Sequence, residues 1–550
     1  MHQTDEALFQ QDDGRCRTPE AHGGGATPST ATAKKPLSFH ITFLALNIMV
    51  LIVSLDATIL AVAIPDIARQ LRGTTLTAFW ASISFMLAVV VTQPLYTSTS
   101  DVLGRKIPLY ASFVLFIAGS VIFSIAQSMS TLIAGRILQG LGAGGIDVLG
   151  EIVVADMTTL KERPLYLGLL AIPMSVGSIL GPSVGALFSQ RLTWRWIGWI
   201  NLPIASFGLV LVFFFMKLRP LGGSMAIRLR RLDWVGMVLF TIGATAFVAP
   251  LSWAGSMYPW SSWKTLLPLI LGVVTLIVFA LYESRPVEPV LPRRLFKSAT
   301  AIVSYCGSFI HGMVVYCLLL YLPLLFQAVW LETPLQSAVS LLPLSIITVA
   351  ISVVSAVSVE FTRRYRWNIW SGWVFLVVGL GLLSLLGPHA STAVKYSAQV
   401  ITGVGIGALY TILVLPVQAT APSVDDTGLA VGMFVSFRLF GALVGLAVGS
   451  TVFSSVWERS IADLHGLPNT IGSLPGLQSG HEAVQLIPSL RTLELPPDAL
   501  TLLLGLYDRS IRAIWYVLIG FSVFGLVSSL LTKEVTLDKE DMGRQRFEDA

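Results

Sequence analysis

The chain has 550 residues, of which 54% are hydrophobic and only 12% charged, and its net charge is +5. Soluble domains carry about 25% charged residues, so the composition excludes an ordinary soluble enzyme or binding module. The basic residues are scattered over short loops rather than gathered in one patch, which argues against a nucleic-acid-binding protein. An integral membrane protein is the class that fits.

The N-terminal segment 1–36 is polar, rich in Gly, Ser, Thr and Ala, and has no signal-peptide pattern. We expect it to be a disordered cytoplasmic tail, so that the first apolar helix serves as the insertion signal. Apolar runs of about 20 residues follow, the length of helix that crosses a bilayer. They predict about fourteen membrane-spanning helices, at 39–63, 79–98, 107–127, 131–155, 165–188, 197–217, 234–254, 264–283, 300–327, 337–358, 367–388, 394–416, 427–453 and 512–532.

The charges of the connecting loops indicate how these helices are oriented. Lysine and arginine gather in alternate loops, as at Arg105 and Lys106, whereas the opposite loops hold few. The positive-inside rule places the Lys/Arg-rich loops, and with them both termini, in the cytoplasm. The segment 454–511 then becomes an outer loop. Its Pro, Gly and Ser content predicts mostly irregular structure, with a short helix near 496–507.

Asp56 lies well inside the first predicted span. Ionisable side chains within a membrane are expensive and usually functional, so this carboxyl group is a candidate proton carrier. The alternative is a polar packing residue beside Thr58 or at the outer end of the helix.

The loop after the second span, Asp101 to Lys106, is a charged motif that joins two helices on the predicted cytoplasmic side. Gly104 permits a tight turn there, and Asp101 and Arg105 are positioned for ion pairs that hold one access state. Asp156, at the predicted cytoplasmic end of the fourth span, is a candidate partner for Arg105. We expect these residues, with Lys106, to form a cytoplasmic gate. The alternative is a solvated loop that only sets orientation.

The fourth predicted span, 131–155, carries four polar residues on one face. Asp147 lies about 20° from Arg136 on the helical wheel and Glu151 about 60°. We expect this face, which also holds Gln139, to line an aqueous cavity. Arginine keeps its proton, and Asp147 is about 16 Å away along the axis, too far for a direct pair. Asp56 is therefore the candidate partner of Arg136. A fixed structural pair is the alternative, and Glu151 could be simply a polar residue near the cytoplasm.

The fifth predicted span has glycines about one and two turns apart, interrupted by a proline. Such a helix packs closely against a neighbour and bends. The residues of this motif are Gly168, Gly177, Gly181, Pro182 and Gly185.

Two further ionisable residues lie inside later spans, His311 in 300–327 and Arg438 in 427–453. Arg438 has no acidic neighbour in the sequence, so it either faces the cavity or contacts a backbone carbonyl. His311 either titrates or binds substrate, or it is a hydrogen-bonded histidine of the core.

The chain repeats itself. Gln139–Gly144 aligns with Thr402–Gly407 at an offset of 263 residues. The glycines of the fifth span align at an offset of 264 with Gly432, Gly441, Gly445 and Gly449. Two consecutive spans that share one offset predict two homologous halves, a parallel repeat. The predicted parts are the tail 1–36, a six-helix half 37–220, two inserted helices with their loops 221–298, a six-helix half 299–532, and a cytoplasmic tail 533–550.

The motifs at Leu55–Pro65, Asp101–Lys106, Arg136–Gly140 and Gly168–Gly185 together resemble the major facilitator superfamily, specifically its fourteen-span drug:proton antiporter branch. The resemblance covers roughly residues 39–532. Further matches to fungal members are Trp194–Pro203, Leu232–Trp234, Tyr321–Pro323, Phe326–Gln327 and Ser340–Pro343. Two departures are Ala186, where the fifth-span motif often has another glycine, and the degenerate second gate loop at Glu360–Arg364.

The resemblance implies an all-α integral membrane protein of the major facilitator fold, whose halves rock around a central cavity. It implies proton coupling at Asp56 and Arg136, a gate at Asp101 and Arg105, and an antiporter helix. The expected activity is export of amphipathic small molecules, such as drugs or secondary metabolites, by a monomer in the plasma membrane. The proton gradient would drive export, with no cofactor or metal.

Other functions are compatible with parts of this sequence pattern. The main rival is proton-coupled uptake, or vacuolar transport, of a dedicated substrate such as a siderophore or a basic amino acid. A transporter-like sensor is disfavoured because the tails are short. An enzyme is disfavoured because no catalytic constellation occurs. No Walker loop is present, and the seven histidines lack zinc-ligand spacing.

Overall fold

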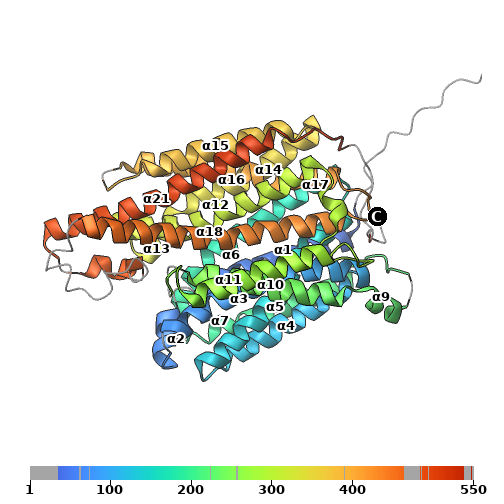
Figure 1. Ribbon diagram of the computed structural model, residues 1–550, viewed down its shortest axis with the longest axis horizontal. Helices are drawn as coiled ribbons and strands as arrows, with labels where there is room; N and C mark the ends of the chain where they lie inside the picture. The colour runs from blue at the N-terminus through green and yellow to red at the C-terminus, as the bar shows by residue number, and fades with distance from the viewer. Residues whose placement is uncertain are drawn as a thin grey trace, which may run out of the picture.

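The computed structural model describes residues 35–60, 63–73, 75–222, 224–254, 258–388, 390–463, 483–484, 486–493, 495–537, 545 and 547. Apart from three isolated β-bridges, the regular structure of these residues is helical. The long helices run roughly side by side, and those of the C-terminal half, yellow to red, lie above those of the N-terminal half in Figure 1. The expected disordered tail lies outside the described residues except for its last two.

The helices follow the chain in three groups. The first group is α1 (Leu37–Ile59), α2 (Ile64–Gln70), α3 (Thr75–Leu103), α4 (Lys106–Ser124), α5 (Met129–Met157), α6 (Arg163–Arg191), α7 (Trp196–Trp199) and α8 (Asn201–Phe215). The second is α9 (Met225–Arg231), α10 (Trp234–Trp253) and α11 (Trp263–Tyr282). The third is η1 (Arg293–Phe296), α12 (Ala299–Val329), α13 (Pro334–Ser340), α14 (Leu342–Thr362), α15 (Arg366–Ser384), α16 (Thr392–Ile412), α17 (Val414–Ala419), α18 (Thr427–Asp463), η2 (Ile487–Thr492) and α21 (Pro497–Ser529).

Within the described residues, thirteen helices are long and apolar enough to cross a membrane. The predicted span that is not among them is α3, although its 29 residues exceed the length a bilayer requires. The last third of α3 is rich in hydroxyl side chains. The all-helical membrane fold expected from the sequence is confirmed.

The predicted outer loop 454–511 differs from the structure. Helix α18 continues to Asp463, and the final long helix, α21, begins at Pro497, so the expected short helix near 496–507 is the first part of α21. The prediction of irregular structure is wrong at both ends of this segment, where α18 and α21 pack against each other through aromatic side chains. The buried rings of Trp457 and Tyr507 lie 4.7 Å apart. Residues 464–482 lie outside the described part.

The sequence repeat corresponds to a repeat in packing. Helix α6 packs on α1 as α18 packs on α12, and α5 packs on α3 and α4 as α16 packs on α14 and α15. Glycines make both sets of contacts close. A methyl group at Gly140 would collide with Phe85 of α3, and one at the aligned Gly403 would collide with Leu344 of α14. The two six-helix units thus have the same internal arrangement, and the α10–α11 hairpin lies against α18 and α3.

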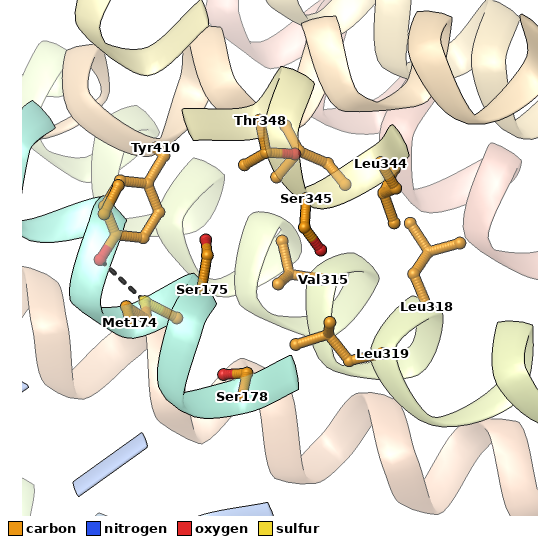
Figure 2. A pocket seen from close by; sticks show the side chains of 12 residues that line it. Met174, Ser175, Ser178, Val315, Leu318, Leu319, Leu344, Ser345, Thr348 and Tyr410 are labelled. Carbon is orange, nitrogen blue, oxygen red and sulfur yellow. Dashed lines mark hydrogen bonds between the residues drawn. The ribbon is translucent and has the colours of Figure 1, made fainter. Parts of the chain in front are cut away.

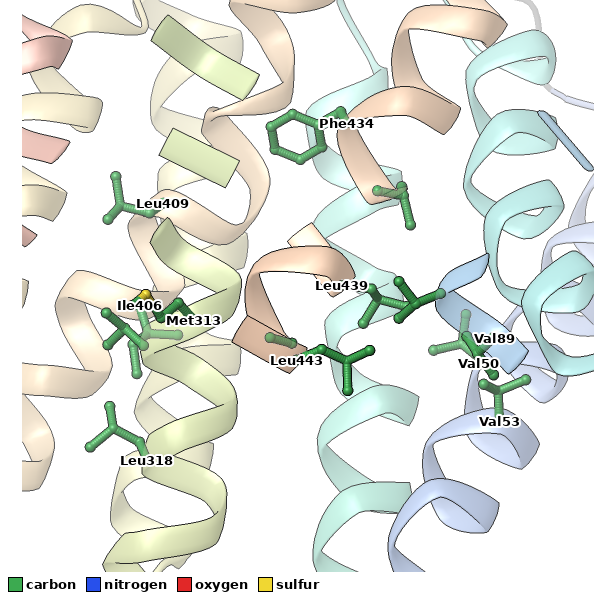
Figure 3. Packing of buried hydrophobic residues seen from close by; sticks show 14 of the residues in the cluster. Val50, Val53, Val89, Met313, Leu318, Ile406, Leu409, Phe434, Leu439 and Leu443 are labelled. Carbon is green, nitrogen blue, oxygen red and sulfur yellow. The ribbon is translucent and has the colours of Figure 1, made fainter. Parts of the chain in front are cut away.

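The two halves meet through α6 against α14 and α18 against α3 and α5. Figure 3 shows Leu439 and Leu443 of α18 lying toward Val50 and Val53 of α1 and Val89 of α3. Lipid is as apolar as these side chains, so close fit rather than exclusion of water holds such helices together in a bilayer. We call the end of the bundle that carries the α3–α4 turn the Arg105 end.

Candidate functional site

Asp56 and Arg136 form an ion pair inside the N-terminal half. The Arg136 guanidinium donates from Nη1 to Oδ2 of Asp56 at 2.6 Å, joining α5 to α1. Both side chains are at most 1% exposed. The structure therefore brings together the two residues that the sequence suggested as partners. A buried pair of this kind is held by its geometry and by the groups that satisfy its remaining hydrogen bonds.

Polar side chains of the same half surround this pair. Asn201 of α8 donates from Nδ2 to Oδ1 of Asp56 at 2.7 Å. Arg136 also donates to Gln139 at 3.2 Å, and Gln139 donates in turn to Ser120 at 3.0 Å. The Arg136 guanidinium lies 4.3 Å from the centre of the Phe85 ring. Sequence reasoning missed Asn201, since no spacing pattern connects it to Asp56.

The predicted aqueous face of α5 is not present in this structure. Arg136 and Gln139 are 1% and 0% exposed, and the arginine donates to the Asp56 carboxylate and to the amide oxygen of Gln139. Further along the same face, Asp147 accepts a 2.8 Å hydrogen bond from Gln93 of α3. The face is divided into two separate polar networks, one within the N-terminal half and one that reaches the other half.

The second network is centred on an ion pair between the halves. Arg438 of α18 donates to Glu151 of α5, 287 residues earlier in the chain, and both residues are buried. The Arg438 guanidinium also lies 4.8 Å from the centre of the Tyr410 ring of α16. The sequence offered Arg438 no acidic neighbour, and only the packing of α18 on α5 supplies one.

His311 of α12 is 2% exposed. Its Nε2 lies 3.1 Å from the carbonyl oxygen of Ile406, so the tautomer with a proton on Nε2 donates this hydrogen bond. The structure thus corresponds to the second sequence reading, a hydrogen-bonded histidine of the core.

The α3–α4 turn holds the predicted gate residues together. Arg105 donates from Nε to Asp156 at 2.8 Å, and its Nη2 lies 3.5 Å from Asp101. Gly104 has a φ of 93°, which L side chains rarely adopt, so the turn requires glycine. The turn also reaches the other half, because a methyl group at Gly428, near the start of α18, would lie 3.2 Å from the Arg105 guanidinium carbon. Lys106 is the first residue of α4 and is partly exposed.

A second buried arginine, Arg163, lies at the Arg105 end. Arg163 is 1% exposed, and it donates to the carbonyl oxygens of Ala155 at 2.5 Å and Thr158 at 2.8 Å. From Nη1 it donates to Gln418 of α17, in the other half, at 3.2 Å. Contacts at Arg105, Arg163 and Arg438 therefore join the two halves on this side of the molecule.

The glycines of α6 press on the turn of α1 that carries Asp56. A methyl group at Gly177 would lie 2.8 Å from the carbonyl oxygen of Leu51, and one at Gly181 would lie 3.0 Å from that of Leu55. Gly185 is similarly close to Ile59. The first glycine of the motif, Gly168, instead faces α14 of the other half. Pro182 lies within α6, as does Pro173.

A cavity lies between the halves, lined by residues of α6, α12, α14 and α16. Figure 2 shows Ser175 and Ser345 directing their oxygen atoms toward this space. On one side of the cavity, the Tyr410 hydroxyl donates to the sulfur of Met174 at 3.0 Å, which joins α16 to α6.

The arrangement of two repeated six-helix units around such a cavity agrees with the sequence comparison. The profile of the Major Facilitator Superfamily matches residues 46–446. The chain belongs to the Major Facilitator Superfamily. It is a multi-pass membrane transporter and not an enzyme.

Full-length relatives are fungal transporters. The MFS-type transporter sphD of Aspergillus fumigatus is 46% identical over 557 residues, covering 99% of this chain and 96% of that protein. The efflux pump FUS6 of Gibberella fujikuroi is 31% identical, with 93% of this chain and 92% of that protein covered. An Aspergillus aculeatus relative, the acurin A biosynthesis cluster MFS-type transporter, is 34% identical, and 94% of each chain is covered.

Two solved structures share the fold. The human organic anion transporter MFSD10 (TETRAN) superposes with a TM-score of 0.55 at 16% identity, covering 85% of this chain and all of that one. The proton:xylose symporter XylE gives a TM-score of 0.57 at 11% identity, with 92% and 98% covered. At such low identities these structures show the architecture alone.

Proposed function

We propose that this transporter exports amphipathic small molecules in exchange for protons that enter the cell. The observation that supports this most is the buried Asp56–Arg136 pair. Among the described residues that the Asp56 carboxylate contacts, Arg136 is the only charged one. Ionisable pairs inside the membrane mark proton and substrate pathways. The direction of transport rests on the full-length relatives that are named efflux pumps.

The chemistry of coupling follows from this pair. A proton on Asp56 cancels the carboxylate charge and leaves Arg136 with only neutral partners, Gln139 and the ring of Phe85. The arginine cannot lose its own proton, so it must find new partners or draw in water. The glycines of α6 pack directly on this turn of α1, so a change at Asp56 reaches the helix that contacts the other half.

The contacts between halves define the conformational step. Alternating access requires the Arg105 end to open, which separates Arg438 from Glu151 and Arg163 from Gln418. We propose that Asp101, Gly104, Arg105, Lys106 and Asp156 form the gate at this end. We also propose that this end faces the cytoplasm, because the positive-inside rule favours the cytoplasm for Lys/Arg-rich loops. We also propose that Asp147 and His311 take part in proton coupling, although neither lines the cavity between the halves in this structure. We further propose that the protein works as a monomer in the plasma membrane.

The decisive experiment is efflux of fluorescent lipophilic compounds from cells that express the chain, with and without a protonophore. We expect protonophore-sensitive efflux that Asp56→Asn abolishes. The matched control is Asp498→Asn, which neutralises an exposed carboxylate at the start of α21 and should leave efflux unchanged. Proton-driven efflux that persists in Asp56→Asn would remove Asp56 from coupling. Accumulation of substrate at acid external pH would instead support an uptake transporter.

A further inference from the structure

The cavity between the halves has a distinct chemistry. None of its twelve described lining residues is charged. Apolar side chains such as Leu318 and Leu344 make up much of the wall, and hydroxyl groups of Ser175, Ser178, Ser345 and Tyr410 interrupt it. A charged ligand would lose its hydration here without gaining an opposite charge, whereas an uncharged ligand with oxygen atoms would find hydrogen-bonding partners.

Tyr410 links this cavity to the ion pair between the halves. Its hydroxyl group donates to Met174 at one side of the cavity, and its ring lies against the Arg438 guanidinium that binds Glu151. A thioether sulfur is a weak hydrogen-bond acceptor, so a carbonyl or ether oxygen of a bound molecule would compete well for the Tyr410 hydroxyl. Such a molecule would also release a direct contact between α16 and α6.

Resting on the export function above, we propose that this cavity, once it widens beyond the roughly 50 Å³ it has in this structure, takes uncharged, largely apolar molecules with an acceptor oxygen, and that Tyr410 signals their binding to Arg438 and Glu151. The hydroxyl group recognises the ligand and leaves Met174. The ring, which moves with it, changes its contact with Arg438. The ring face attracts the guanidinium, so a change in this contact alters the balance of the buried ion pair. Tyr410 is thus a specificity-determining and positioning residue.

The test uses purified full-length protein and two tritiated probes. Progesterone is uncharged and carries carbonyl oxygens, and tetraphenylphosphonium is apolar with a permanent positive charge. We expect progesterone to bind and tetraphenylphosphonium to bind roughly tenfold more weakly or worse, because the cavity cannot compensate a charge. Failure of progesterone to bind, or equal binding of both probes, overturns the proposed substrate class.

Three variants separate the roles of Tyr410. Tyr410→Phe keeps the ring and loses the hydroxyl group, so progesterone affinity should fall about tenfold, the loss of one hydrogen bond. Met174→Leu replaces the competing sulfur with a side chain of similar volume, so progesterone should bind roughly several-fold more tightly. Tyr396→Phe removes a hydroxyl group from the same helix outside the cavity and serves as the control. Unchanged affinity in Tyr410→Phe overturns the role of the hydroxyl group.

Coupling has its own readout, the hydrogen–deuterium exchange of peptides that cover 156–166 and 418–430 when saturating progesterone is added. Progesterone should change this exchange in wild type, where the Tyr410 hydroxyl leaves Met174 and the ring moves against Arg438. Tyr410→Phe and Tyr410→Leu should bind saturating progesterone without that change. The wild-type change in either variant overturns the link to Arg438. Binding with these properties, but no transport of progesterone in vesicles, would refute the export function and leave the binding inference intact.

Discussion

Arg136 of α5 donates a 2.6 Å hydrogen bond to Asp56 of α1, and neither side chain is more than 1% exposed. Besides the coupling role that we propose, the pair should contribute to the stability of the fold. Removing one charge leaves the other buried without compensation, which typically costs about 3–5 kcal/mol, while removing both costs much less. The pair also fixes how α1 and α5 lie relative to each other.

We therefore expect Asp56→Ala and Arg136→Leu each to lower the apparent melting temperature of the detergent-solubilised protein clearly. The double variant should be more stable than the sum of the two losses predicts, since groups in direct contact are coupled. Thermal unfolding followed by tryptophan fluorescence measures all three. Strictly additive losses would mean that the two charges do not depend on each other.

The Glu151–Arg438 pair joins the halves, so its loss should loosen the Arg105 end. We expect Glu151→Gln to speed hydrogen–deuterium exchange in peptides that cover 156–166 and 418–430, where the halves meet. The exchanged pair Glu151→Arg with Arg438→Glu should return exchange toward the wild-type rate. Equal exchange in wild type and Glu151→Gln would show that this ion pair does not hold the two halves together.

The glycine motif of α6 and its repeat in α18 should be equally intolerant of side chains. A Cβ at Gly181 would lie 3.0 Å from the carbonyl oxygen of Leu55, and one at Gly445 would lie 2.7 Å from that of Met313. Gly181→Val and Gly445→Val should both reduce the yield of monodisperse protein in size-exclusion chromatography, because overpacking typically costs about 1–3 kcal/mol.

Gly168→Ala is the matched control for these valine variants, since its nearest neighbour atom would be 3.4 Å away, an ordinary contact. Wild-type yield from Gly181→Val would contradict close packing of α6 on α1. If Gly445→Val were tolerated while Gly181→Val were not, close packing would be essential only in α6, the copy of the motif that contains Pro182.

Glu283 predicts a pH dependence of stability. It follows α11, is 4% exposed, and accepts a hydrogen bond from the backbone N–H of Leu291. Burial raises the pKa of Glu283 from 4.5 to about 7, although the bond from Leu291 partly opposes this rise. The folded state then holds the proton more tightly than the unfolded state, so this group's contribution to stability is lost as the pH rises from 4.5 to about 7.

We expect Glu283→Gln to remove that contribution, because the amide stays neutral and can still accept the Leu291 N–H. The measurement is the difference in apparent melting temperature between wild type and Glu283→Gln at pH 5 and pH 8. The variant should gain relative stability at the higher pH. The same difference at both pH values would show that Glu283 titrates normally.

Some parts of the site could be predicted from the sequence and others could not. Glycines at one offset in two consecutive spans predicted the repeat, and the structure has both copies packed in the same way. Asp56 was suggested as the partner of Arg136 because an arginine inside a span needs a partner and few acids lie there. Asp156 was suggested for Arg105 because it lies at the predicted cytoplasmic end of the fourth span. Asn201, Glu151 as the partner of Arg438, and Arg163 as a link to Gln418 were not foreseen.

A membrane protein of two repeated halves can be predicted from the sequence, because apolar runs of bilayer length and glycine spacing are properties of single helices. The pairing of Arg438 with Glu151, and the position of Tyr410 between the cavity and Arg438, come from tertiary packing. Helical periodicity fixes which residues share a face, but the partner of that face depends on how helices hundreds of residues apart pack, and no local spacing encodes that choice.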